Sequence, residues 1–238
     1  MLQSRFATYS DRPVANRIFT NRERPIALFD AARADLPPDR HRLLVFYGVG
    51  GQGKTALCRH LRRRLADENQ HGRRWGHLDL TEPQWHEPAR GLLQLRLSLR
   101  ASGSIRCTLF DVAIARYWER AYPTEDIELA FKDLLGDHEG ILGAIADNTR
   151  DWLDLAEELP AGLGLGLKSL NLARRWLKER GAKQACDALR GLEQIDSVQL
   201  LDRLPYFLGL DLQAHRQAGG ERTPNPAPIL FIDTYEAL

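Results

Sequence analysis

A chain of 238 residues is long enough to bury a hydrophobic core and usually makes one or two domains. Its 33 lysines and arginines balance 32 aspartates and glutamates, and the formal net charge of +1 argues against a basic surface for nucleic acid or an anionic membrane. No apolar run approaches the roughly 18 residues that span a bilayer, and the amino terminus lacks the apolar core of a signal peptide. We therefore expect a cytoplasmic globular protein, and neither a membrane nor nucleic acid is an expected partner.

The cysteines and histidines show no ligand spacing. Cys58, Cys107 and Cys186 lie far apart and form no Cys-x-x-Cys or Cys/His motif, and no two histidines have the helical i, i+4 spacing of a zincin. This pattern is typical of a reduced, cytosolic protein and predicts no zinc site. His77 and His138 are interpreted as ordinary structural or surface residues.

The strongest local pattern is LLVFYGVGGQGKTAL, residues 43–57. Its β-branched and aromatic start predicts a buried strand over 43–47, and leucines spaced by four, Leu57, Leu61 and Leu65, predict a helix after the glycines. Between them, Gly48–Thr55 matches the spacing G-x-x-x-x-G-K-[ST] of a phosphate-binding loop, and this motif requires a strand before it and a helix after it.

This loop has the composition that phosphate binding needs. Glycine lets backbone amides approach an anion and adopts positive φ angles, and the start of the next helix adds N–H donors and a positive dipole end. Lys54 would contact the β- and γ-phosphates, and the Thr55 hydroxyl would ligate Mg²⁺. With ATP or ADP and Mg²⁺ as cofactors, the predicted nucleotide-binding residues here are Gly48, Val49, Gly50, Gly51, Gln52, Gly53, Lys54, Thr55 and Ala56.

Residues 81–220, after a second predicted strand at Trp75–Leu80, are mainly helical in pattern. Leu93–Leu99 alternates like a strand but also places leucines on one helical face, and we favour a helix. Thr108 and Asp111 form a candidate capping box at the start of a helix. Four further helices are expected at 125–135, 141–158, 165–180 and 195–217, the last with a kink at Pro205. We interpret four aromatic residues as core or interface anchors: Trp118, Tyr122, Trp152 and Trp176.

An apolar strand pattern near the end of the chain, residues 228–233, finishes in a carboxylate. A phosphate-binding loop needs such a carboxylate at the end of a neighbouring strand to hold Mg²⁺, and Asp233 is the candidate, acting through a water shared with Thr55. Glu236 could orient or deprotonate the attacking water. The predicted catalytic residues are thus Lys54, Asp233 and Glu236, and the predicted metal site is Thr55 with Asp233.

Three motifs together resemble the STAND NTPases, relatives of the AAA+ ATPases. IFTNRERPIALF, residues 18–29, is similar to the F-x-G-R-E element of their nucleotide domains, with Asn21 in place of the usual glycine. GVGGQGKT has the doubled glycine typical of the NB-ARC and NACHT groups, and FIDTYEAL resembles a Walker B strand. Many relatives carry a second acid directly after the first, where this chain has Thr234, so Glu236 would have to reach the water from three residues further on.

The resemblance implies an α/β fold: a P-loop NTPase core with parallel strands, incomplete at the carboxyl end, plus a large helical insertion. Residues 1–80 would hold the amino-terminal element and the P-loop half, 81–220 the insertion and 221–238 the Walker B strand, while Phe19, Asn21 and Arg22 would lie near the adenine. In this family the sensor strand lies between the P-loop and Walker B strands in the sheet but follows Walker B in sequence. The chain would therefore be a truncated, amino-terminal part of a bacterial STAND ATPase.

The function implied by this resemblance is an ATP/ADP-binding module of a signal-transduction NTPase. It would be a nucleotide-controlled oligomerisation switch with slow Mg²⁺-dependent hydrolysis, self-associating through the NTPase domain and acting on an unknown protein partner. An alternative is a P-loop small-molecule or nucleotide kinase whose helical part forms an acceptor domain. A third reading, an interaction module with a purely structural loop, is disfavoured because Lys54, Thr55 and Asp233 are all present.

Overall fold

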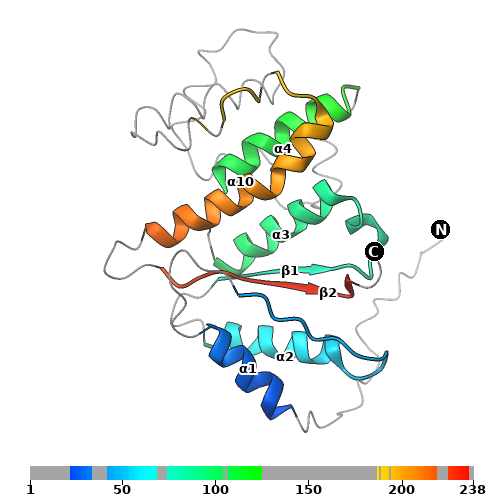
Figure 1. Cartoon of the computed structure of the whole chain (residues 1–238), viewed down its shortest axis with the longest axis vertical. Helices are drawn as coiled ribbons and strands as arrows, with labels where there is room; N and C mark the ends of the chain where they lie inside the picture. Colours follow the sequence, from blue (N-terminus) through cyan, green and yellow to red (C-terminus); the bar gives the residue numbers. More distant parts are fainter. Residues whose placement is uncertain are drawn as a thin grey trace, which may run out of the picture.

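The computed structural model describes residues 22–33, 42–68, 74–103, 105, 107–124, 187, 189–192, 194–218 and 225–235. In this part of the chain two parallel strands lie between two groups of helices, a mixed α/β arrangement (Figure 1). Helices α1 and α2 cover one face of the strands, and α3 covers the other and carries α4 and α10 on its far side. The elements in chain order are α1 (Glu23–Arg33), α2 (Lys54–Asp67), β1 (Trp75–Asp79), the 3-10 helix η2 (Pro83–Trp85), α3 (Pro88–Gly103), α4 (Thr108–Ala121), α10 (Ser197–Gln217) and β2 (Ile229–Asp233).

The two strands confirm the strand predictions near residues 75 and 229. They pair in parallel with Trp75 opposite Ile229 and Asp79 opposite Asp233. One face of the pair, with Trp75, Ile229 and Phe231, packs on a core formed by four buried side chains of α1 and α2: Phe29, Leu57, Leu61 and Leu65. The leucines that are spaced by four along α2 therefore form the buried face of this helix. The register also brings the carboxyl ends of both strands, each ending in an aspartate, to the same edge.

Helix α3 covers the opposite face of β1 at close range. A Cβ added at Gly76 would lie 3.0 Å from side-chain carbons of both Leu99 and Leu230 and 3.3 Å from the carbonyl oxygen of Leu95. The hydroxyls of Ser98 and Ser102 on α3 accept hydrogen bonds from the backbone N–H groups of His77 and Trp75, at 2.7 and 3.0 Å. The segment Leu93–Leu99 is helical as expected, and Ser98 and Ser102 of α3 bind amides at the outer edge of β1.

The predicted capping box of α4 is wrong. Thr108 is the first helical residue, and the N-cap position is Cys107, which makes no side-chain capping bond. The amides of Leu109 and Phe110 donate instead to the carboxylate of Asp211 on α10, at 3.2 and 2.8 Å. Asp111 is engaged elsewhere, because its two oxygens accept hydrogen bonds from the buried Arg96 guanidinium at 2.7 and 2.6 Å. A side chain from another helix therefore provides the cap.

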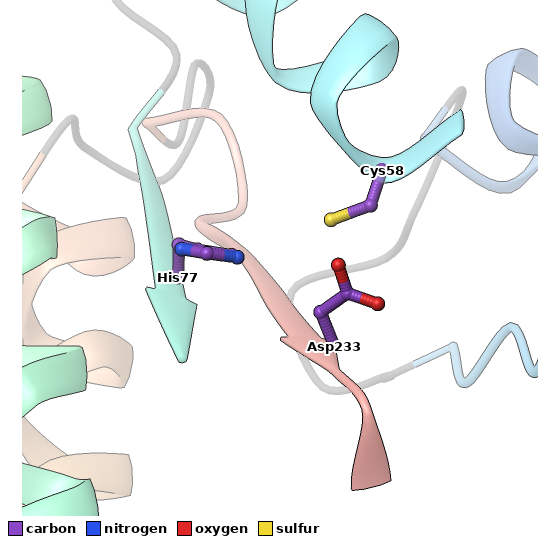
Figure 2. Close-up of side chains that lie close together, drawn as sticks. All are labelled: Cys58, His77 and Asp233. Atoms are coloured by element: carbon purple, nitrogen blue, oxygen red, sulfur yellow. The ribbon is translucent and has the colours of Figure 1, made fainter. Parts of the chain in front are cut away.

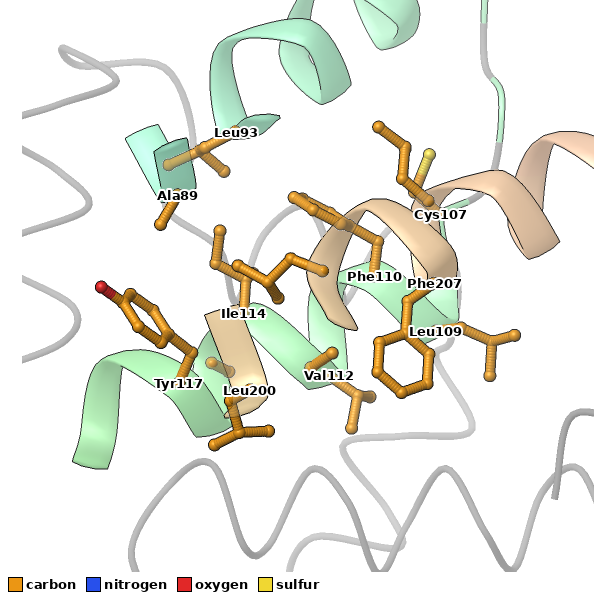
Figure 3. Packing of buried hydrophobic residues seen from close by; sticks show 14 of the residues in the cluster. Ala89, Leu93, Cys107, Leu109, Phe110, Val112, Ile114, Tyr117, Leu200 and Phe207 are labelled. Carbon is orange, nitrogen blue, oxygen red and sulfur yellow. The ribbon is translucent and has the colours of Figure 1, made fainter. Parts of the chain in front are cut away.

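Helices α3, α4 and α10 enclose the largest hydrophobic core among the described residues (Figure 3). Phe110, Ile114 and Trp118 of α4 are fully buried in it, so the structure places Trp118 in the core, as interpreted from sequence. Tyr122 packs on the Trp118 ring, with the two centroids 4.9 Å apart. Helix α10 corresponds to the helix expected at 195–217 and contains Pro205 in its interior.

The predicted strand over 43–47 does not form. Residues 42–48 have no regular secondary structure, and the sheet of the described residues has only the strands β1 and β2. Leu43 and Tyr47 are 88% and 84% exposed, so the segment is not buried either. Apolar, β-branched residues favour an extended backbone, but a strand also needs a hydrogen-bonded neighbour, and this segment has none in the described structure.

Some sequence predictions fall outside the described residues. They concern the helices at 125–135, 141–158 and 165–180, and the residues Phe19, Asn21, His138, Trp152, Trp176, Cys186 and Glu236. Among the helices that are described, none has the length and apolar character needed to cross a bilayer.

Candidate functional site

The glycine-rich segment forms a tight turn that leads directly into α2. Gly51 and Gly53 have φ angles of 80° and 79°, in the left-handed region that glycine adopts without a Cβ clash. Gly53 is the N-cap of α2 and has no side chain with which to cap it, so the first-turn amides donate to no capping side chain. Uncapped amides and the positive end of the helix dipole make this turn suitable for an anion.

Two cationic side chains lie against this turn. The Lys54 ammonium donates to the carbonyl oxygen of Gly48 at 2.9 Å, so its side chain folds back over the loop. The Arg22 guanidinium donates to the carbonyl oxygen of Gln52. Arg22, which the resemblance would place near the adenine, thus lies at the loop itself in this structure.

Thr55 and Asp233 are brought into contact although they are 178 positions apart. The Thr55 hydroxyl donates to Asp233 Oδ1 at 3.3 Å, and the same oxygen accepts the Thr234 amide at 3.0 Å. Asp233 is only 7% exposed. The contact arises because β2 pairs alongside β1 and ends beside the first turn of α2. Thr234 then takes a φ of 60°, uncommon for a residue other than glycine, so the backbone turns directly after the carboxylate.

Cys58 and His77 lie next to Asp233 on the same side of the strands (Figure 2). Cys58 comes from α2, His77 from β1 and Asp233 from β2, and one ligand atom of each lies within 4.8 Å of the others. His77 Nε2 is buried and has no hydrogen-bond partner in the structure. Sequence spacing could not find this group, because the residues come from three separate elements. The only local signal is that Cys58 follows Thr55 by one helical turn.

The surroundings favour a neutral Cys58 and a neutral His77 beside the charged Asp79 carboxylate. Burial raises the pKa of the Cys58 thiol to about 11, and the Asp233 charge acts in the same direction. Burial and the nearby Arg62 charge lower the pKa of His77. For Asp79, burial opposes ionisation, but hydrogen bonds from the Thr81 hydroxyl and amide lower its pKa below the usual value. At neutral pH the site therefore presents a thiol, an imidazole lone pair and the Asp79 carboxylate.

A cavity of about 970 Å³ lies beside this group. Lys54 and Asp233 belong to its lining, together with residues of α1, α2, α10 and β2 and with residues 42–46. Segment 42–46 and β2 thus line one cavity without being hydrogen-bonded to each other.

Comparisons of the chain with protein-family models, with curated proteins and with solved structures found no match. Evidence for a function therefore comes from the sequence motifs and the side-chain geometry.

Proposed function

We propose that this chain binds ATP or ADP with Mg²⁺ through Gly48–Thr55 and Asp233, in a P-loop NTPase core. The observation that carries the proposal is the 3.3 Å contact between the Thr55 hydroxyl and the Asp233 carboxylate at the start of α2. In P-loop NTPases the metal is held by a Ser or Thr of the loop and by an aspartate from a neighbouring strand. The same pair meets here directly after a glycine turn with uncapped amides.

The chemistry assigned to each side chain follows from its position. The loop amides and Arg22 would bind phosphate oxygens, and Lys54 would exchange its bond to the Gly48 carbonyl for one to a phosphate. Mg²⁺ would supply charge neutralisation at the phosphates, and Thr55 and Asp233 would hold it. In hydrolysis, water attacks the γ-phosphorus, the bond to the bridging oxygen breaks, and ADP and phosphate leave. Glu236 is our candidate to accept the proton of that water.

We further propose that the module is a STAND-type switch, in which nucleotide state controls self-association and contact with a protein partner, with slow hydrolysis resetting it. Besides the three motifs, the arrangement of segment 42–46 and β2 supports this assignment. Both line the same cavity without pairing, as expected if another strand separates the loop strand from the metal-binding strand in the family's sheet.

A small-molecule or nucleotide kinase is the second candidate, favoured by one observation. Helix α10 contributes Tyr206, Gln213 and Arg216 to the cavity that Lys54 and Asp233 also line, so the helical part borders the same space as these residues. A kinase requires a soluble acceptor to stimulate ATP turnover. A switch shows the same slow turnover with or without such an acceptor.

Titration calorimetry with ADP and Mg²⁺ tests nucleotide binding. We expect Lys54→Ala to weaken binding at least about tenfold, equivalent to roughly 1.4 kcal/mol, because a cation at the phosphates is lost. Arg24→Ala, which removes an exposed cation on α1, is the matched control and should bind like the wild type. Equal affinity of Lys54→Ala and the wild type, with both folded by circular dichroism, would exclude the phosphate-loop assignment.

A further inference from the structure

We propose that Cys58 Sγ, His77 Nε2 and an Asp233 carboxylate oxygen form a site for a divalent transition metal of the Zn²⁺ class. One ligand atom of each residue lies within 4.8 Å of the others, and the His77 ring points toward Cys58 and Asp233 from a different element (Figure 2). An ion about 2.0–2.3 Å from each atom would bring them to roughly 3.4–3.8 Å apart, so the side chains need to close by only about 1 Å. Rotation of the cysteine and histidine side chains can supply this movement.

The backbones that carry these ligands are held in place. The His77 amide donates to Ser98 Oγ at 2.7 Å, and the carbonyl oxygen of Asp233 accepts the amide of Leu80 at 3.1 Å. Cys58 lies between the buried Leu57 and Leu61 on α2, whose apolar face packs on the strands. Ligands on packed helices and strands form more precise sites than ligands on loops.

The donor set distinguishes this site from a magnesium site. Mg²⁺ prefers oxygen ligands, whereas sulfur and imidazole nitrogen together favour Zn²⁺ and similar ions. His77 Nε2 is buried and without a hydrogen-bond partner, which is costly for a polar atom unless something else binds it. Three protein ligands also leave a fourth position for water, as in many zinc centres.

Charge balance is compatible with a dication. On metal binding the Cys58 thiol releases a proton to solvent, and thiolate plus Asp233 carboxylate then neutralise the ion. Outside the cluster, the charges of Arg62 and Asp79 act on both Cys58 and His77, and the charge of Arg59 acts on His77 with a smaller effect. The guanidinium of Arg62 lies over the Trp75 ring, 5.7 Å from its centroid.

One consequence rests on the proposed function. Asp233 is also our magnesium ligand, so Zn²⁺ at the cluster would compete with Mg²⁺ for its carboxylate and inhibit Mg²⁺-dependent turnover. Zinc binding itself does not depend on the nucleotide proposal.

The test uses the full chain, freed of metal and kept reduced with a phosphine, without nucleotide. Zn²⁺ affinity is measured by competition with a chromophoric chelator, and Co²⁺ is used as a spectroscopic probe. We expect one Zn²⁺ per chain and a thiolate-to-cobalt charge-transfer band. Cys58→Ser should abolish the band, and Cys58→Ser and His77→Gln should each weaken Zn²⁺ binding at least about tenfold, because each removes a metal ligand.

The matched controls remove a thiol and an imidazole at positions outside the cluster. Cys107→Ala, in the helical core, and His60→Gln, on α2, should bind Zn²⁺ like the wild type. Wild-type affinity in folded Cys58→Ser and His77→Gln, or no thiolate band with Co²⁺, would overturn the proposal. Lys54→Ala separates the two proposals, because it should bind Zn²⁺ normally even though it loses nucleotide. Zinc binding without any nucleotide affinity in the wild type would retain the metal site and reject the nucleotide function alone.

Discussion

At the scale of single residues, the position of Asp233 requires hydrogen-bond donors or a cation close to its carboxylate. It is buried, and one of its oxygens accepts hydrogen bonds from both the Thr55 hydroxyl and the Thr234 amide. A buried carboxylate needs such partners or a cation, because removal from water destabilises the charged form. Two donors on one oxygen leave the other oxygen available for a metal.

Asp233→Asn keeps the size of the side chain but removes its charge. We expect Mg²⁺-dependent ATP turnover to fall by on the order of 100-fold, since a charged metal ligand contributes several kcal/mol, while nucleotide binding in EDTA changes little. Steady-state phosphate release and calorimetry in EDTA measure the two effects. Asp202→Asn, an exposed carboxylate on α10, is the control. Normal turnover of Asp233→Asn would show that Asp233 has no metal role.

At the scale of elements, α3 lies close against β1 at Gly76. Leu95 and Leu99 of α3 lie over this residue, and even the backbone carbonyl of Leu95 would be 3.3 Å from an added Cβ. A methyl group there would have to displace either the helix or the side chains of Leu99 and Leu230. The α3–β1 spacing therefore depends on the absence of a side chain at one position.

Gly76→Ala should lower the free energy of unfolding by about 1–3 kcal/mol, the usual cost of overpacking a core. Urea denaturation followed by circular dichroism measures this loss. The matched control is Gly209→Ala on α10, where an added Cβ meets no atom within 4 Å. This control should stabilise the protein by up to roughly 1 kcal/mol, because alanine favours a helix over glycine. Equal stabilities of Gly76→Ala and the wild type would show that α3 can shift freely on the strand.

At the scale of the whole molecule, charges from distant segments act on each other. His215, near the end of α10, is partly buried. Burial and, to a smaller extent, the charge of Arg74 lower its pKa. Arg74 directly precedes β1, so this interaction joins parts of the chain that are far apart in sequence. Global stability should therefore depend on pH through His215.

The sign of that dependence follows from proton linkage. Below about pH 6.5, the ordinary histidine pKa, the unfolded chain protonates His215 more readily than the folded chain does. The folded state thus loses stability as the pH falls through this range, and the loss stops below the folded-state pKa. The free energy of unfolding of His215→Gln, measured in urea between pH 7.5 and pH 5, should fall less than that of the wild type. Parallel curves for the two proteins would contradict the assignment.

Features that depend only on residues close together in the sequence could be predicted without the structure. Leucine spacing predicted α2 and α3, the apolar run before Asp233 predicted β2, and the glycine pattern marked the turn at Gly51 and Gly53. Helical periodicity and glycine's access to positive φ are local properties, so the order of residues is sufficient.

Features that need a distant partner could not be predicted in this way. Residues 43–47 have the composition of a strand but lack a hydrogen-bonded neighbour, and the cap of α4 comes from Asp211 on another helix. The meeting of Cys58, His77 and Asp233 depends on the parallel register of two strands and on how α2 packs across them. Backbone pairing and side-chain convergence are long-range events, so these contacts exist only after the chain has folded.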